Sequence, residues 1–235
     1  MIYYLLMLVA IVISFFAQAK VKSAYSKWDK VRNSRGITGA EAARRILDAN
    51  GLQHIQITAI PGTLTDNFNP RTNTISLSMN VYSGTSIAAI GIAAHEVGHA
   101  IQHSVGYLPI KIRTSLVPIV NFGGGISWFF ITFGLLLNGY LSSSCGQNDF
   151  GYTLASIGVI LYATVTLFHL VTLPVELNAS SRAKNQIIAL FSANENEITG
   201  IRKVLGAAAM TYVASLLTSA IQLFRLISLV NSRRR

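Results

Sequence analysis

Long apolar segments constrain this chain more than any other feature of its sequence. Residues 2–19, 116–141 and 152–173 are each apolar and long enough to cross a bilayer as a helix, at about 1.5 Å of rise per residue. A fourth apolar segment, residues 204–224, could span the membrane or lie in it as a re-entrant or interfacial helix. Only 12% of the 235 residues are charged, against about 25% in an ordinary soluble domain. The sequence therefore predicts a multi-pass protein of the lipid bilayer.

The distribution of charge predicts how the chain crosses the membrane. Basic residues follow the first apolar segment instead of preceding it, which favours an uncleaved anchor over a cleaved signal peptide. Residues 138–151 contain no Lys or Arg, so this loop is expected outside and the flanking basic segments in the cytoplasm. The net charge of +10 comes from residues that flank apolar segments, which argues against a nucleic-acid partner. Cys145 is the single cysteine, so an internal disulfide is excluded.

The polar part of the chain predicts a small α+β domain. Thr38 and Glu41 form a capping-box pattern at the start of a helix that Gly51 would end. Residues 53–60 and 74–78 alternate in polarity like strands, and the segment between them, residues 66–73, has the composition of a turn. The strand at 74–78 is expected either at the sheet edge, where an extended peptide could be laid, or as a plain hairpin strand. The fold class predicted is mainly α with a small β-sheet.

The sequence His95-Glu96-Val97-Gly98-His99 is an H-E-x-x-H pattern that follows a run of helix formers. On a helix, His95 and His99 lie on one face and can offer two imidazole nitrogens to one ion, with Glu96 beside them. Catalytic zinc takes three protein ligands and keeps a position for water, whose proton Glu96 would accept. His103 is not expected to bind, because one helix cannot bring three successive turns to a single ion. The pattern predicts a Zn²⁺ site with Glu96 as general base.

Glu176 is the candidate for the third zinc ligand. It closely follows Pro174, which is expected to end the third apolar helix. The predicted membrane hairpin returns Glu176 to the cytoplasmic side, where His95 and His99 lie. A glutamate at the membrane boundary, paired with Arg182, is the alternative reading.

Other side chains are weaker candidates with ordinary structural alternatives. Asn178 or Ser180 could hydrogen-bond a ligand imidazole. His169 lies within an apolar segment and could act in the site or simply pack there. Tyr212 could stabilise an oxyanion or sit at the membrane interface, while His54 falls on the polar face of its predicted strand. The glycines at 123–125 are expected to let membrane helices pack closely.

The predicted domain organisation has five parts. They are an N-terminal anchor at 1–19, a cytoplasmic zincin-like domain at 20–115, a transmembrane hairpin at 116–173, a third-ligand helix and cytoplasmic segment at 174–203, and an apolar helix with a basic tail at 204–235.

The chain resembles the YugP-like family of membrane-bound neutral zinc metallopeptidases. The resemblance runs over nearly the whole chain and rests on segments that include residues 64–66, 69–71, 94–102 and 173–176. It implies a zinc endopeptidase with ligands at His95, His99 and Glu176 and with Glu96 catalytic. The layout is also similar to that of the HtpX-type and CAAX prenyl endopeptidases. The chain departs from the family pattern at three asparagines, where acidic or histidine residues are expected: Asn67, Asn69 and Asn178.

The function predicted is hydrolysis of peptide bonds in a membrane-associated peptide or protein, at the cytoplasmic face of the cytoplasmic membrane. An intramembrane site-2-type protease is a rival, but it pairs its motif with an Asp-Gly in a spanning helix. Here Asp149 and Gly151 lie in a polar loop. A non-catalytic scaffold that holds zinc is a second rival. Structural zinc normally has four protein ligands, so an open three-ligand site argues against it.

Overall fold

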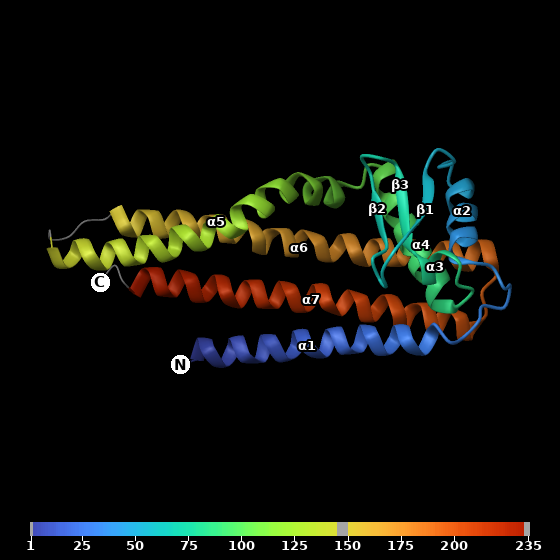
Figure 1. Cartoon of the computed structure of the whole chain (residues 1–235), viewed down its shortest axis with the longest axis horizontal. Coiled ribbons are helices and arrows are strands. Elements are labelled where there is room, and N and C mark those ends of the chain that lie inside the picture. Colours follow the sequence, from blue (N-terminus) through green and yellow to red (C-terminus); the bar gives the residue numbers. More distant parts are fainter. Residues whose placement is uncertain (1, 145–149, 233–235) are drawn as a thin grey trace. The chain divides into compact units, whose positions relative to one another are not determined.

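The computed structural model describes residues 2–144 and 150–232, with side chains from residue 5 to 140 and from 150 to 232. The protein is mainly helical with one small sheet, which confirms the predicted fold class (Figure 1). Its elements are α1 (Ile2–Trp28), α2 (Gly39–Ala49), β1 (Gln56–Ile60), β2 (Asn67–Asn69), β3 (Thr74–Ser78), α3 (Met79–Tyr82), α4 (Ile87–Ser104), α5 (Leu108–Ser144), α6 (Phe150–Phe191) and α7 (Glu195–Ser232). Cys145 lies outside the described residues, as does the centre of the loop predicted to be external.

The chain forms two compact units. The membrane unit comprises Met1–Phe15, Lys111–Leu173 and Tyr212–Arg235. The site unit comprises Phe16–Ile110 and Pro174–Thr211. Both units therefore use parts of the long helices, and the division within α6 falls at Pro174.

In the part of the chain that the structure describes, four helices are long and apolar enough to cross a membrane, namely α1, α5, α6 and α7. The segment at 204–224 belongs to α7, which runs without a break from Glu195 to Ser232. Pro174 lies inside α6, so the prediction that it ends the membrane helix is wrong. A proline removes one backbone hydrogen bond, but a helix can continue through it where neighbouring contacts hold both halves.

The tightest packing in the membrane unit joins α5 and α6 through small residues. A Cβ on Gly134 would lie 2.5 Å from the amide nitrogen of Ala155. A Cβ on Gly158 would lie 2.7 Å from the carbonyl oxygen of Ser127. The glycines at 123–125, predicted to have this role, are less crowded, because a Cβ on Gly125 would meet nothing within 4 Å. The close approach therefore lies farther along α5 than the sequence suggested.

The sheet of the site unit has the order β1-β3-β2. β3 pairs with β1 in parallel and with β2 in antiparallel orientation, so both Ile57 and Phe68 lie opposite Ile75. The strand at 74–78 is therefore central, so the alternative that it forms the sheet edge is wrong, whereas its antiparallel pairing with the preceding strand β2 agrees with the hairpin alternative. β2 forms within the segment predicted as a turn. The Asp66 carboxylate explains this pairing, because it accepts hydrogen bonds from the amide and hydroxyl of Ser78 at 2.7 and 3.1 Å and holds the segment against β3.

α2 begins at the predicted capping box. The Thr38 hydroxyl accepts from the amide of Glu41 at 3.1 Å, and the Glu41 carboxylate accepts from the amide of Thr38 at 2.8 Å. Gly51 follows the helix with a φ of +72°, a conformation that glycine adopts without a steric penalty. These local signals set the bounds of α2 and present its apolar face, including Ile46, to the core.

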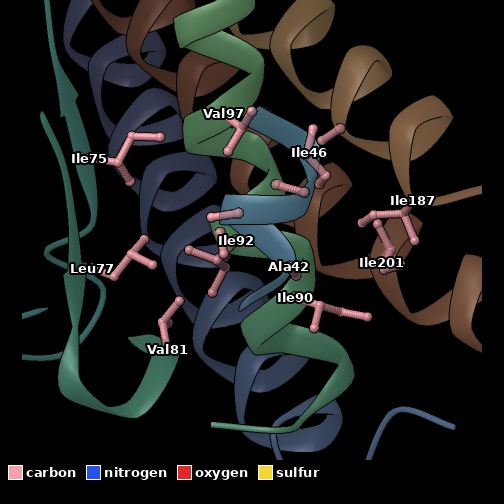
Figure 2. Packing of buried hydrophobic residues seen from close by; sticks show 14 of the residues in the cluster. Ala42, Ile46, Ile75, Leu77, Val81, Ile90, Ile92, Val97, Ile187 and Ile201 are labelled. Carbon is pink, nitrogen blue, oxygen red and sulfur yellow. The ribbon is translucent and has the colours of Figure 1, made fainter. Parts of the chain in front are cut away.

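α4 is the central helix of the site unit and is buried over nearly its whole length. Its N-cap is Ser86, whose side chain accepts from the amide of Ala89 at 3.0 Å. α2, α3 and the sheet pack against it. Figure 2 shows the surrounding core, to which α2 contributes Ile46, β3 contributes Ile75 and Leu77, α6 contributes Ile187 and α7 contributes Ile201. A helix enclosed in this way is a rigid support for the side chains it carries.

Candidate metal centre

Two side chains of α4 and one of α6 converge in the site unit. The Oε2 atom of Glu176 lies 3.2 Å from Nε2 of His95 and 3.5 Å from Nε2 of His99. The possible ligand atoms of the three residues all lie within 4.8 Å of one another. Glu176 is 2% exposed. The structure thus brings together the three residues that the sequence predicted as metal ligands.

The spacing of these atoms fits a zinc ion. Zinc binds nitrogen and carboxylate oxygen at about 2.0–2.2 Å, so two ligands of a tetrahedral ion lie about 3.3–3.5 Å apart. The separations of 3.2 and 3.5 Å between Glu176 and the imidazoles match this spacing. Two imidazoles and one carboxylate also form a donor set typical of catalytic zinc, which keeps one position for water.

A close backbone contact sets the distance between α4 and α6. A Cβ on Gly98 would lie 2.5 Å from the carbonyl oxygen of Ala179. Gly98 is one of the two unspecified positions of the H-E-x-x-H pattern, and Ala179 follows Glu176 by three residues. The absence of a side chain at Gly98 therefore lets the helix with the two histidines approach the helix with Glu176.

Each imidazole also has a hydrogen-bond partner on its second nitrogen. Nδ1 of His99 lies 3.0 Å from Oε1 of Gln102, and Nδ1 of His95 lies 3.2 Å from the hydroxyl of Ser180. Both rings therefore face Glu176 with Nε2. Ser180 contacts an imidazole as predicted, whereas Asn178 contacts Gln102 instead. Arg182, the partner in the alternative reading of Glu176, donates through Nε to Asn178 at 2.8 Å.

Glu96 is 8% exposed and lies in the field of the cluster. Burial raises the pKa of the Glu96 carboxyl above its ordinary value, and the charges of His95 and His99 oppose this shift. Burial also acts to lower the pKa of His99, but the carboxylates of Glu176 and Glu96 outweigh it, so the pKa of His99 is raised. A carboxylate with a raised pKa is a stronger base than an ordinary carboxylate, as general-base catalysis favours.

The remaining candidates lie apart from this cluster. The ring of His103 packs edge-on against the ring of Phe68 in β2, with 5.6 Å between the two ring centroids. His54 is exposed. His169 and Tyr212 belong to the membrane unit and are not members of the cluster.

Sequence reasoning missed Gln102 and Asp66. Gln102 follows His99 by three residues and therefore shares its helix face, which was a usable signal. Asp66 was assigned to a turn, but its charge acts on Glu96 and contributes to the raised pKa of that carboxyl.

Apolar helices long enough to span a membrane, in one chain with a largely buried cluster of two histidines and a glutamate, define a candidate membrane metalloenzyme. A family model described as "Putative neutral zinc metallopeptidase" matches residues 3–231, and the chain belongs to this family. A relative named "Putative membrane protease YugP", from Bacillus subtilis (strain 168), is 44% identical over 227 residues. The alignment covers 97% of this chain and 96% of the relative. These matches confirm the resemblance, and the chain is a membrane protein. No solved structure matches it.

Proposed function

We propose that this protein is a zinc-dependent endopeptidase whose ligands are His95, His99 and Glu176, with Glu96 as general base. The convergence of Glu176 on the two imidazoles carries this proposal. Glu176 follows His95 by 81 residues, yet its Oε2 atom lies 3.2 Å from Nε2 of that residue. Two buried ionisable groups and a half-buried one are costly to bring together unless something such as a metal ion satisfies them. The family and the relative's name support a protease that uses zinc.

The chemistry is divided between the ion and the protein. Bound zinc would polarise the substrate carbonyl and lower the pKa of water. Glu96 accepts a proton from water as the water oxygen attacks the carbonyl carbon, and it passes the proton to the leaving amine as the C–N bond breaks. Ser180 and Gln102 hold the imidazoles in place through their Nδ1 atoms.

The edge of the sheet offers a place for the peptide. β2 is an edge strand that packs against α4, and its Phe68 contacts His103 on that helix. An exposed edge can pair with an extended peptide through main-chain hydrogen bonds. We infer that a peptide or protein substrate, associated with the membrane, is laid along β2. Cleavage should then weaken for peptides N-methylated at the backbone positions that pair with β2, whereas unchanged cleavage of every such peptide would contradict this placement.

We infer that the active site faces the cytoplasm, because basic residues follow the first apolar segment and are absent from the 138–151 loop. A membrane-impermeant thiol reagent should label Cys145 in intact cells. In a Cys145→Ser background, a cysteine introduced at the exposed Arg71 should be labelled only after permeabilisation. Labelling of the residue-71 thiol in intact cells would reverse the assigned orientation.

The central experiment compares zinc content and proteolysis for the wild type, Glu96→Gln and Glu176→Ala, each purified in detergent. Glu96→Gln should retain zinc and lose cleavage of a denatured or membrane-associated protein, because the ligands remain and the base is removed. Glu176→Ala should lose both zinc and cleavage. Full zinc retention in Glu176→Ala would remove that residue from the ligand set. Zinc binding without any proteolysis by the wild type would favour the scaffold, and cleavage confined to segments within the bilayer would favour the site-2-type protease.

A further inference from the structure

We propose that Arg182, Asn178 and Gln102 form a hydrogen-bond relay that fixes which nitrogen of His99 carries the proton. This inference rests on the zinc site of the proposed function, because it concerns how the free electron pair of His99 is directed to the ion. The relay consists of four hydrogen bonds of 2.7 to 3.0 Å, of which the two made by the Gln102 NH₂ group join α4 to α6. Its three members act on the ion only through His99, so they are positioning residues.

The orientation of the Gln102 amide follows from its partner on α6. One end of the amide lies 2.7 Å from the backbone carbonyl oxygen of Val175. A carbonyl oxygen can only accept a hydrogen bond, so this end must be the NH₂ group. The other end, Oε1, then lies 3.0 Å from Nδ1 of His99 and can only accept. Nδ1 must therefore carry the proton, which leaves the electron pair of Nε2 directed toward Glu176 and the proposed ion.

The Asn178 amide is oriented independently and agrees with this assignment. Arg182 has only donors, and its Nε lies 2.8 Å from one end of the Asn178 amide, which must be the oxygen. The same oxygen lies 3.0 Å from Nε2 of Gln102 and accepts a second hydrogen bond. Two groups with a single possible role, the guanidinium and the Val175 carbonyl, thus fix every donor and acceptor between Arg182 and His99.

Burial makes this arrangement resistant to rearrangement. Gln102 is 0% exposed, so a reversed amide would place its NH₂ against His99 and its oxygen against the Val175 carbonyl, with no access to water. The partner of His95 imposes no such choice, because the Ser180 hydroxyl can donate or accept. The relay therefore fixes the tautomer of one imidazole of the pair.

Asn178 offers a substitution that keeps the relay and one that breaks it. In Asn178→Asp, the carboxylate still accepts from both Gln102 and Arg182. In Asn178→Leu, both hydrogen bonds are lost and the side chain has a similar size. Gln102→Leu removes the acceptor for Nδ1 of His99 directly. Gln186→Leu is the matched control, because Gln186 also bonds an asparagine outside its own helix, the α2 C-cap residue Asn50, but is not bonded to the imidazoles.

Two measurements that do not depend on proteolysis test the relay in the full-length protein. Competition with a chelator gives the zinc affinity. ¹⁵N spectra of histidine-labelled, zinc-free Glu176→Ala protein, recorded where imidazole is neutral, show which nitrogen of His99 carries hydrogen when the Glu176 carboxylate no longer competes for a proton on Nε2. We expect a loss of zinc affinity of about 10–100-fold for Gln102→Leu, a smaller loss for Asn178→Leu, and wild-type affinity for Asn178→Asp and Gln186→Leu. The spectrum of His99 should show Nδ1–H in Glu176→Ala and both tautomers when Gln102→Leu is added to it.

The proposal is overturned if His99 of the Glu176→Ala protein carries its proton on Nε2, or if Gln102→Leu and Asn178→Leu both bind zinc like the wild type. Should Gln102→Leu fail to fold, Asn178→Leu and the Glu176→Ala spectrum decide the question. Loss of zinc in Asn178→Asp equal to that in Asn178→Leu would also contradict the relay, because the acidic side chain preserves both acceptor contacts. Failure of the proposed function is recognised separately, by zinc binding that survives Glu176→Ala or by the absence of proteolysis.

Discussion

Replacing Gly98 by alanine is expected to separate the two helices that carry the candidate ligands. The added Cβ would lie 2.5 Å from the carbonyl oxygen of Ala179 and 3.2 Å from its Cα. These are backbone atoms of α6, so no side chain can rotate away to relieve the clash. The substitution tests whether the contact between Gly98 and Ala179 sets the geometry of the metal centre.

The size of the effect follows from the distances. A carbon and a carbonyl oxygen in contact lie about 3.3–3.6 Å apart, so α4 and α6 must move apart by about 0.9 Å. The 3.2 Å separation between Nε2 of His95 and Oε2 of Glu176 would then grow to about 4 Å. A functional site tolerates a displacement of only about 0.5 Å from its productive geometry. A displacement of about 1 Å commonly costs about 100-fold in function. We expect Gly98→Ala to lower zinc affinity by about 10–100-fold and to lower any zinc-dependent cleavage at least as much.

Gly91→Ala is the matched control on the same helix. A Cβ on Gly91 would meet the Cγ1 atom of Ile201 at 3.5 Å, an ordinary contact. Both substitutions raise helix propensity by about 1 kcal/mol, so only the clash with α6 distinguishes them. Zinc affinity measured by chelator competition should be unchanged in Gly91→Ala. Equal affinities in the two variants would refute the argument that this backbone contact sets the site.

Four further expectations follow from the same structure. Chelation should lower the melting temperature of the wild type but not of Glu176→Ala. Zinc at about 100 times its dissociation constant adds about 2.7 kcal/mol to the free energy of unfolding of a protein that binds it. Equal shifts in melting temperature for the two proteins would contradict zinc binding at this site. Zinc affinity, followed by titration across pH, should fall as pH decreases, because protons compete for the imidazoles. Burial acts to lower the pKa of His99, but Glu176 and Glu96 raise it overall, so the loss of zinc affinity should begin at a higher pH than for an ordinary imidazole. A zinc affinity that stays unchanged down to acidic pH would exclude imidazole ligands. Ser86→Ala should lower the free energy of unfolding by about 1 kcal/mol, measured by thermal or denaturant unfolding, because the N-cap of α4 is lost. An unchanged melting temperature would show that the cap is dispensable. In the same assay, Ile46→Ala should lower the free energy of unfolding by about 2–5 kcal/mol, because Ile46 is fully buried. Ile188→Ala, at a 41% exposed position, should lower it much less. Similar losses in the two variants would place the core elsewhere.

Local signals allowed part of the fold to be predicted from the sequence. The bounds of α2 follow from its own capping residues, Thr38 and Glu41, and the helix formers before His95 belong to α4. Such features depend on contacts within a few residues of each other. The central position of β3 depends on pairing with both β1 and β2, which no local pattern specifies, so the sequence could not decide between a sheet edge and a hairpin strand. The continuity of α6 through Pro174 likewise depends on contacts that hold the two sides of the proline.

The candidate site shows the same division between local and distant information. The spacing of His95 and His99 is a property of one helix and can be read from the sequence. Glu176 was found through the predicted hairpin, which returns the chain to the side of the histidines. The role of Gly98 could not be found in this way, because it depends on Ala179 of another helix. The Gln102 relay was missed for the same reason, since its partners Val175 and Asn178 lie on α6.

The contacts around Glu176 indicate which part of α6 determines its position. Pro174 lacks the amide hydrogen that would link it to the preceding turn, so α6 lacks one backbone hydrogen bond two residues before Glu176. The residues that follow Glu176 make the contacts with α4. Ala179 contacts Gly98, Ser180 hydrogen-bonds His95, and Asn178 hydrogen-bonds Gln102. All three partners belong to α4. The third candidate ligand is therefore positioned by the helix that carries the other two, and the geometry of the centre depends on the packing of α4 against the part of α6 that follows Pro174.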